Sequence, residues 1–236
     1  MIALALAVLS PFASAGLPTT GAWLPGAADP GDNHGGVSVT GAGAVVYAGA
    51  PGAIGGGSAN AWGAFGPNGA FAVQGSFATL TRAADGVTGL YALGGVRYEV
   101  LNEKRFALAP WFGALAEVEG DLLPGEVYLA LGIAGEATLG KARLDFSVPL
   151  VIVPTDDPDY FFDADGGINE GIAAALVTAD LGVTVALGER DELRFGKVLF
   201  VPGVQWRHDF GRLYLEAGAS VWLLVNEAHL GVGATF

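Results

Sequence analysis

Several features common in soluble proteins are missing from this 236-residue sequence. It has no cysteine, which excludes a disulfide framework, a cysteine-ligated metal site and a thiol nucleophile. Lysine and arginine together number 11 against 24 acidic residues, which gives a formal charge of −13. Because the sequence has no cluster of basic residues, it lacks the positive surface that nucleic-acid binding needs, and we expect no nucleic-acid partner. Charged residues make up 15% of the chain, below the roughly 25% of ordinary soluble domains.

Long hydrophobic runs are also missing. After residue 15, no window of about 20 residues is free of glycine, proline and charge, so we do not expect a membrane-spanning helix. The chain is nevertheless 52% hydrophobic, and its 38 glycines have no three-residue period. The hydrophobic content excludes a disordered acidic chain, and the absence of a period excludes a collagen-like one.

Apolar and polar side chains alternate along much of the sequence. Between residues 127 and 139, apolar residues and glycine occupy the odd positions, and the one charged residue, Glu136, occupies an even position. Between residues 212 and 225, both charged residues share one face. A period of two predicts β-strands, because a helical period of 3.6 residues would spread the charges around a cylinder. The same alternation occurs in residues 90–100 and 141–152.

Two architectures fit this alternation. A soluble sandwich or barrel would bury its apolar face, whereas a closed transmembrane barrel would turn that face toward lipid. The apolar faces run for about six residues without a charge, and the opposite faces are rich in glycine, alanine and serine, which suits a narrow lumen. We therefore predict an all-β, antiparallel transmembrane β-barrel. A soluble periplasmic β-barrel or sandwich that binds an apolar ligand stays open as the alternative.

Turn-forming residues divide the chain into about twelve strands. If residues 193–210 formed one strand across Pro202 and Gly203, the parity of the strands would change and force another merger, which would give ten strands. The glycine-rich stretch 50–60 is predicted to be a flexible loop, and 154–171 to be the longest external loop. Short connections follow alternate strands and would form tight turns at the other end, at 66–69, 101–104, 140, 188–192 and 211. The expected strands are 37–48, 59–65, 69–80, 89–100, 105–118, 126–139, 141–153, 172–187, 193–200, 204–210, 212–225 and 228–236.

The first 15 residues resemble a secretory signal peptide. An apolar run extends through Leu9, Pro11 interrupts it, and the small residues at 13–15 form a cleavage site before Gly16. No lysine or arginine precedes the apolar run, so a buried N-terminal helix is the alternative interpretation. We expect residues 1–15 to be removed on export.

The last eight residues, HLGVGATF, carry a second pattern. A polar residue, a glycine, an apolar residue and a final aromatic residue stand at spacings that resemble the terminal assembly signal of Gram-negative outer-membrane β-barrel proteins. The resemblance covers residues 37–236 as architecture and only these eight residues as a motif. The matching positions are His229, Gly231, Ala234 and Phe236.

This resemblance implies a location and a set of partners. The barrel would lie in the outer membrane of a Gram-negative bacterium, in contact with outer-membrane lipids, and would be inserted by the barrel-assembly machinery. Residues 16–36 would form a periplasmic N-terminal segment and residues 37–236 the barrel. The expected function is a porin-like narrow pore or a structural barrel, with no cofactor and no enzymatic activity.

Many charged residues fall on the inward faces of the predicted strands. They would either select solutes by charge at a constriction or pair with one another and fill a closed lumen. Because basic and acidic residues are nearly equal in number, we favour internal pairs for most of them. The predicted lumen charges are Arg97, Glu99, Glu136, Lys141, Arg143, Asp145, Asp180, Arg207, Asp209, Arg212 and Glu216.

Evidence for a metal site or a catalytic site is weak. Loop 154–171 is rich in carboxylates, but their spacing does not match a calcium-binding EF-hand loop, so we expect a solvated acidic loop. Ser220 and His229 are predicted to face inward on neighbouring strands, which keeps an outer-membrane lipid hydrolase open as a third function. Trp111 and Trp222 also point inward in this register.

Overall fold

The computed structural model describes residues 35–46, 52–65, 69–82, 86–103, 105–120, 127–154, 180–198, 201–221 and 225–236. The predicted signal peptide, residues 16–34 of the predicted N-terminal segment and most of the predicted loop 154–171 lie outside these residues. No helix in the described residues is long and apolar enough to cross a membrane. The strands are β1 (Gly35–Val46), β2 (Gly52–Phe65), β3 (Gly69–Arg82), β4 (Gly86–Tyr98), β5 (Leu101–Glu103), β6 (Phe106–Gly120), β7 (Val127–Leu139), β8 (Ala142–Pro154), β9 (Asp180–Ala186), β10 (Asp191–Val198), β11 (Val201–Asp209), β12 (Leu213–Val221) and β13 (Val225–Thr235).

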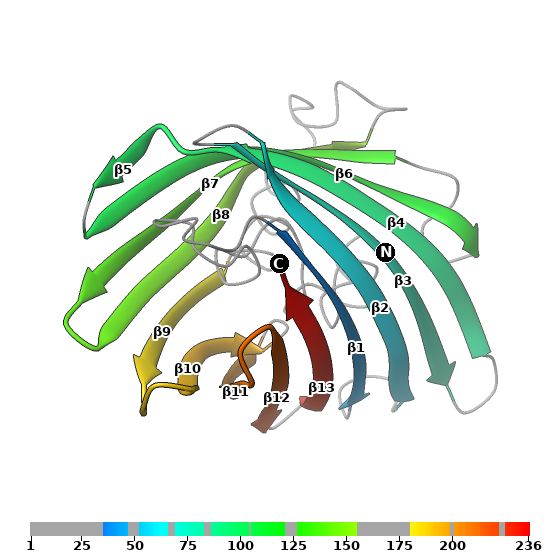
Figure 1. Cartoon of the computed structure of the whole chain (residues 1–236). Coiled ribbons are helices and arrows are strands. Elements are labelled where there is room, and N and C mark those ends of the chain that lie inside the picture. The colour runs from blue at the N-terminus through cyan, green and yellow to red at the C-terminus, as the bar shows by residue number, and fades with distance from the viewer. Residues whose placement is uncertain are drawn as a thin grey trace.

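Twelve long strands pair antiparallel in one sheet. Strands that follow one another in the chain are neighbours, β1 also pairs with β13, and β4 pairs with β6 (Figure 1). Each long strand is therefore hydrogen-bonded on both sides, and the succession of pairings forms a ring. The three-residue β5 pairs only with β6, beside the end of β4. The predicted antiparallel barrel of about twelve strands is confirmed, and β10 and β11 are two separate paired strands, so the ten-strand alternative is wrong.

Two sequence-based boundaries are corrected by the structure. The predicted flexible loop at 50–60 is wrong, because Gly52–Asn60 belong to β2 and pair on both sides, with β1 and with β3. Hydrogen bonds from two neighbours override the low strand propensity of glycine. The predicted strand 212–225 is also too long, since β12 ends at Val221 and Val225 already begins β13.

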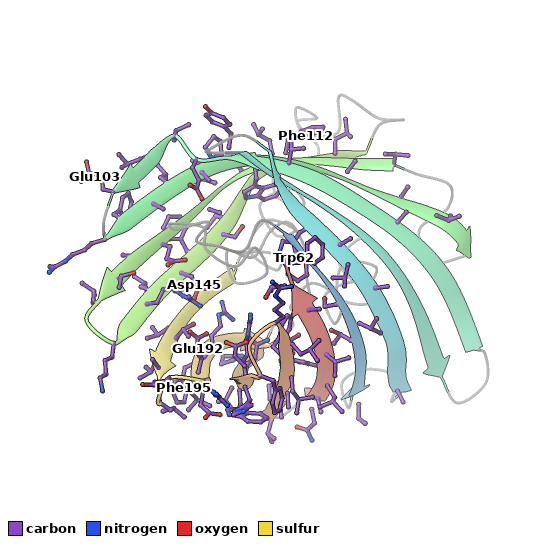
Figure 2. The ribbon with its side chains drawn as sticks, in the orientation of Figure 1. Trp62, Glu103, Phe112, Asp145, Glu192 and Phe195 are labelled. Atoms are coloured by element: carbon purple, nitrogen blue, oxygen red, sulfur yellow. The ribbon has the colours of Figure 1, made fainter. Side chains whose placement is uncertain are left out.

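Side chains divide between the two faces of the sheet according to the parity of their position. On β1, Val37 and Val39 are 46% and 59% exposed, whereas Ser38 and Thr40 are 8% and 2% exposed. In Figure 2, Phe112 and Phe195 point outward, and Trp62, Asp145 and Glu192 lie on the inner side. Among described residues, eleven polar or charged residues are buried against six hydrophobic ones. The polar face is thus inside, the reverse of a soluble protein.

Several large inward side chains lie against glycines of neighbouring strands. A side chain at Gly132 would overlap the Trp111 ring, and one at Gly36 would overlap the Trp62 ring. The register explains both contacts, because each ring stands directly opposite its glycine across the strand pair. Aromatic residues that cover glycines in this way stabilise sheets and help to pin their register. Tyr214 over Gly233 and His229 over Gly218 repeat the arrangement.

Short turns join alternate strands at one end of the ring. Gly140, between β7 and β8, and Gly211, between β11 and β12, have positive φ values of 67° and 96°. Glycine adopts this conformation without strain, which is why the chain can turn tightly at these two positions. The turns predicted at 140 and 211 are confirmed. The beginning of β1 and the end of β13 lie at the same end, because Gly35 and Phe236 exchange two backbone hydrogen bonds of 3.0 Å.

We expect Gly132→Val to destabilise the protein, because the new side chain would overlap the Trp111 ring and the Val148 carbonyl. Overpacking of this kind costs about 1–3 kcal/mol. Urea unfolding in lipid vesicles, followed by tryptophan fluorescence, would measure the change. Gly41→Val is the matched control, since a Cβ at Gly41 meets nothing within 4 Å. Equal losses in both variants would contradict the packing described above.

Candidate functional site

The candidate site is a group of inward charged side chains near the short-turn end. We call this group the turn-end collar. Its members lie on five strands of the ring, within about five residues of the short turns. The collar consists of Glu136 (β7), Arg143 and Asp145 (β8), Glu192 and Arg194 (β10), Arg207 and Asp209 (β11), and Glu216 (β12).

The tightest contact in the collar joins β8 and β10. Arg194 Nη2 donates a hydrogen bond of 2.7 Å to Asp145 Oδ2, and Nε donates one of 3.2 Å to the same oxygen. The Asp145 side chain is 1% exposed and the Arg194 side chain 8% exposed. On β9, Thr184 Oγ1 lies 3.5 Å from Asp145 Oδ1. A buried, charge-assisted pair of this kind holds its strands in one register, because neither charge can be left alone in the interior.

A glycine on β9 makes this pair possible. β9 lies between β8 and β10, and Gly182 pairs with Asp145 on one side and with Gly196 on the other. A side chain at Gly182 would overlap the Arg194 guanidinium. The arginine therefore crosses β9 directly over the glycine backbone to reach the carboxylate.

Arg143 links two further strands to the collar. Its guanidinium lies 3.9 Å from Glu136 on β7 and 3.6 Å from Glu192 on β10. The Arg143 and Glu192 side chains are 33% and 35% exposed, so water screens their interaction more than that of the buried pair. Arg194 Nη1 also lies 3.4 Å from Gln205 Oε1 on β11. The collar thus consists of separate polar contacts across β7 to β11. Among its ion-paired members, Arg143, Glu192 and Asp209 have the most exposed side chains.

Arg207 forms the last part of the collar. Its Nε and Nη2 atoms each donate a 3.1 Å hydrogen bond to Asp209 Oδ1. The guanidinium carbon also lies 4.0 Å from the centre of the Tyr214 ring, a cation–π contact with β12. Glu216 stands opposite Arg207 in the β11–β12 register.

The remaining predicted lumen charges lie elsewhere. Glu99 is buried just after β4, whereas Lys141 and Arg212 are exposed and lie in the short turns. For Arg97 and Asp180 the structure describes the backbone but not the side chain.

Two collar residues, Glu192 and Arg194, were absent from the predicted set. The alternation could have identified Arg194, because Leu193 and Phe195 on either side of it have the apolar character of an outward face. The sequence instead predicts a turn at Glu192, whereas β10 begins one residue before it.

Ser220 and His229 both lie on the inner face, on β12 and β13. Ser220 Oγ and His229 Nδ1 are buried, and neither has a hydrogen-bond partner among the described residues. The serine–histidine hydrogen bond that nucleophilic catalysis requires is therefore not formed between them. No group of three or more potential metal ligands occurs within the described part of the chain. The carboxylates predicted in loop 154–171 lie outside that part.

The predicted assembly signal lies on β13 and the residue after it. His229 and Gly231 are buried on the inner face, Ala234 is half-buried, and Phe236 is 63% exposed. Phe236 continues the row of exposed apolar residues formed by Leu230 and Val232.

No protein-family model and no curated protein matches this chain. Several solved structures are similar to it. An outer-membrane channel from Pseudomonas putida is 14% identical, with a TM-score of 0.56 over 88% of this chain and 99% of the channel. The KdgM porin in complex with a disordered oligogalacturonate is 8% identical, with a TM-score of 0.53 over 84% of this chain and 99% of the porin. The chain therefore has the fold of the outer-membrane β-barrel proteins, as the resemblance implied.

We expect Asp145→Asn to destabilise the barrel strongly, because it leaves the Arg194 charge buried without a counter-charge. Breaking a buried ion pair from one side costs about 3–5 kcal/mol. Urea unfolding in lipid vesicles would measure this loss. Replacing both partners in Asp145→Leu/Arg194→Met should recover most of the stability, since no isolated charge remains.

A second pair of variants tests the crossing over β9. Gly182→Ala should lower stability by displacing Arg194, whereas Gly188→Ala, in the following turn, meets nothing within 4 Å and should not. Equal changes of stability in the two alanine variants would show that Arg194 can reach Asp145 without a glycine at position 182.

Proposed function

We propose that this protein is an outer-membrane β-barrel whose interior forms a narrow, polar passage for small hydrophilic solutes. The observation that carries the proposal is the reversal of its faces: large apolar side chains are exposed outside, and polar side chains are buried inside. Lipid is the environment in which such an outer surface is stable. Outer-membrane lipids would then surround the barrel, and the barrel-assembly machinery would insert it.

The polar lining also bears on the soluble alternative. A soluble barrel that binds an apolar ligand needs an apolar cavity. The inner face instead carries Ser38, Thr40 and Ser147 together with the collar, and its large rings lie along the wall against glycines. This lining suits water and hydrophilic solutes.

The collar would control which ions pass. It has five carboxylates and three guanidinium groups among its described members, and the buried Asp145–Arg194 pair largely neutralises itself. Arg143 and Glu192 are an accessible, oppositely charged pair, and Asp209 is a further accessible carboxylate. Rings of charged side chains set ion selectivity in channels, so we expect a weak preference for cations.

The proposed pore can be tested by electrical recording. The protein in the outer-membrane fraction should migrate faster on SDS gels before boiling than after it, as a folded barrel does. In planar bilayers under a salt gradient, we expect a small conductance with a weak cation preference. Arg143→Gln should shift the reversal potential toward cations, and Glu192→Gln should shift it toward anions, because each removes one accessible charge.

Glu189→Gln is the control for these shifts, because Glu189 is an exposed turn residue outside the collar. It should leave the reversal potential unchanged. A folded barrel without any conductance would leave only a structural role. A soluble protein with no band shift would support the ligand-binding alternative instead.

We further propose that the barrel is not a lipid hydrolase. The observation is that Ser220 Oγ has no hydrogen-bond partner among the described residues, so the serine–histidine hydrogen bond of a nucleophilic site is not formed there. The wild-type protein should hydrolyse phospholipid vesicles no faster than buffer does, measured by release of free fatty acid. A wild-type rate that disappears in Ser220→Ala and in His229→Ala would overturn this proposal.

A further inference from the structure

A basic residue stands at the same structural position in four short turns. It is the residue immediately before the first residue of β6, β8, β10 and β12. All four side chains are exposed, and none forms an ion pair with another described residue. We call these residues the basic rim. They are Arg105, Lys141, Arg190 and Arg212.

The backbone holds the four residues in equivalent places. The carbonyl of each accepts a hydrogen bond of 2.8–3.1 Å from the strand beside it. The rim residues precede every second strand, so neighbouring positions are two strands, or roughly 10 Å, apart. The basic rim therefore follows the wall from β6 to β12 at one depth. The donors are the backbone N–H groups of Thr138, Ala186, Asp209 and Thr235.

Exposed apolar residues directly adjoin the basic rim. Phe106 follows Arg105, Leu139 lies two residues before Lys141, and Phe210 and Leu213 flank Arg212, all of them exposed. The apolar outer surface therefore extends to the rim, and the positive charges begin where it ends. In a membrane this boundary lies at the depth of the lipid head groups.

Polar aromatic contacts mark the same depth on β10 and β11. Asp191 Oδ1 accepts a 3.0 Å hydrogen bond from Trp206 Nε1 and lies 2.8 Å from His208 Nδ1. The His208 ring in turn packs edge-on against Phe210, with the ring centres 4.5 Å apart. Rings with an apolar body and a polar tip are typical of the membrane interface.

The charge at the two ends of the barrel is unequal. The chain has only 11 basic residues, and the basic rim contains four of them. The connection 154–171, which leaves β8 at the opposite end, has six carboxylates and no lysine or arginine. A chain with a net charge of −13 thus presents four exposed basic residues at one end of the barrel, where the exposed carboxylates in the same connections are Glu103 and Glu189 within the described part of the chain.

We propose that the basic rim binds the phosphate groups of anionic phospholipids in the leaflet at the short-turn end. The proposal rests on the proposed function, because it requires the apolar surface to lie in a membrane. Guanidinium groups form paired hydrogen bonds with phosphate, and an ammonium group acts as a point charge. Four cations spaced along one depth can each contact a separate head group.

The test compares unfolding temperatures of the full-length protein in two kinds of vesicle, phosphatidylcholine alone and phosphatidylcholine mixed with phosphatidylglycerol. The band shift on SDS gels reports unfolding. Phosphatidylglycerol should raise the unfolding temperature of the wild-type protein, and added salt should reduce this rise by screening. Lys141→Gln/Arg212→Gln should retain about half of the rise, because two of four charges remain. Neutralising all four residues should abolish it.

Arg82→Gln/Lys197→Gln is the matched control, since it also removes one lysine and one arginine, but in the halves of β3 and β10 distant from the short turns. It should retain the full rise. The proposal would be overturned if phosphatidylglycerol raised the unfolding temperature of the quadruple variant as much as that of the wild-type protein. It would also be overturned if the control variant lost this rise.

Conductance in phosphatidylcholine keeps the two proposals distinguishable. If the wild-type protein neither conducts nor shows a band shift there, the membrane pore is wrong. If it conducts normally but phosphatidylglycerol has no effect on its stability, only the lipid contact is wrong.

Discussion

Backbone hydrogen bonding around a ring is the constraint on which this structure depends. A strand in contact with hydrocarbon has no water to satisfy its N–H and C=O groups, so both of its edges must be paired. The pairing of β1 with β13 supplies the contact that a simple succession of hairpins would leave open, and the pairing of β4 with β6 continues the succession past the short β5. Once the ring exists, the parity of a position decides whether its side chain faces outward or inward. The separation of apolar and polar surfaces follows from this geometry.

The ring also gives the glycines a structural role. Inward side chains of twelve strands compete for a confined space, and glycine on a neighbouring strand lets a large group lie along the wall. Trp111 lies against Gly132, and the Arg194 guanidinium lies over Gly182. The second case joins packing to electrostatics, because only the missing side chain of Gly182 lets Arg194 reach Asp145. The glycines beneath these side chains therefore shape the interior.

Sequence reasoning succeeded where the signal is local. The alternation in β12 placed Leu213 outside and Tyr214 inside, and the structure agrees. It failed at 50–60, where composition resembles a loop but two neighbouring strands supply every ladder partner. It also overlooked Arg194, although the parity of the apolar residues on either side assigns it to the inner face. Composition was the weaker guide, because the glycine-rich residues 52–60 resemble a loop in composition although they form part of β2.

The sequence by itself determined the strand period, the approximate number of strands and the face of most side chains within a strand, because these depend on neighbours along one strand. Only the tertiary structure decided which charges meet. Asp145 and Arg194 are 49 residues apart and lie on strands separated by β9, so their contact depends on the register of three strands. The same register left Lys141 and Arg212 in exposed turns rather than in the lumen. Register is set by hydrogen bonding between distant segments, and no short stretch of sequence contains that information.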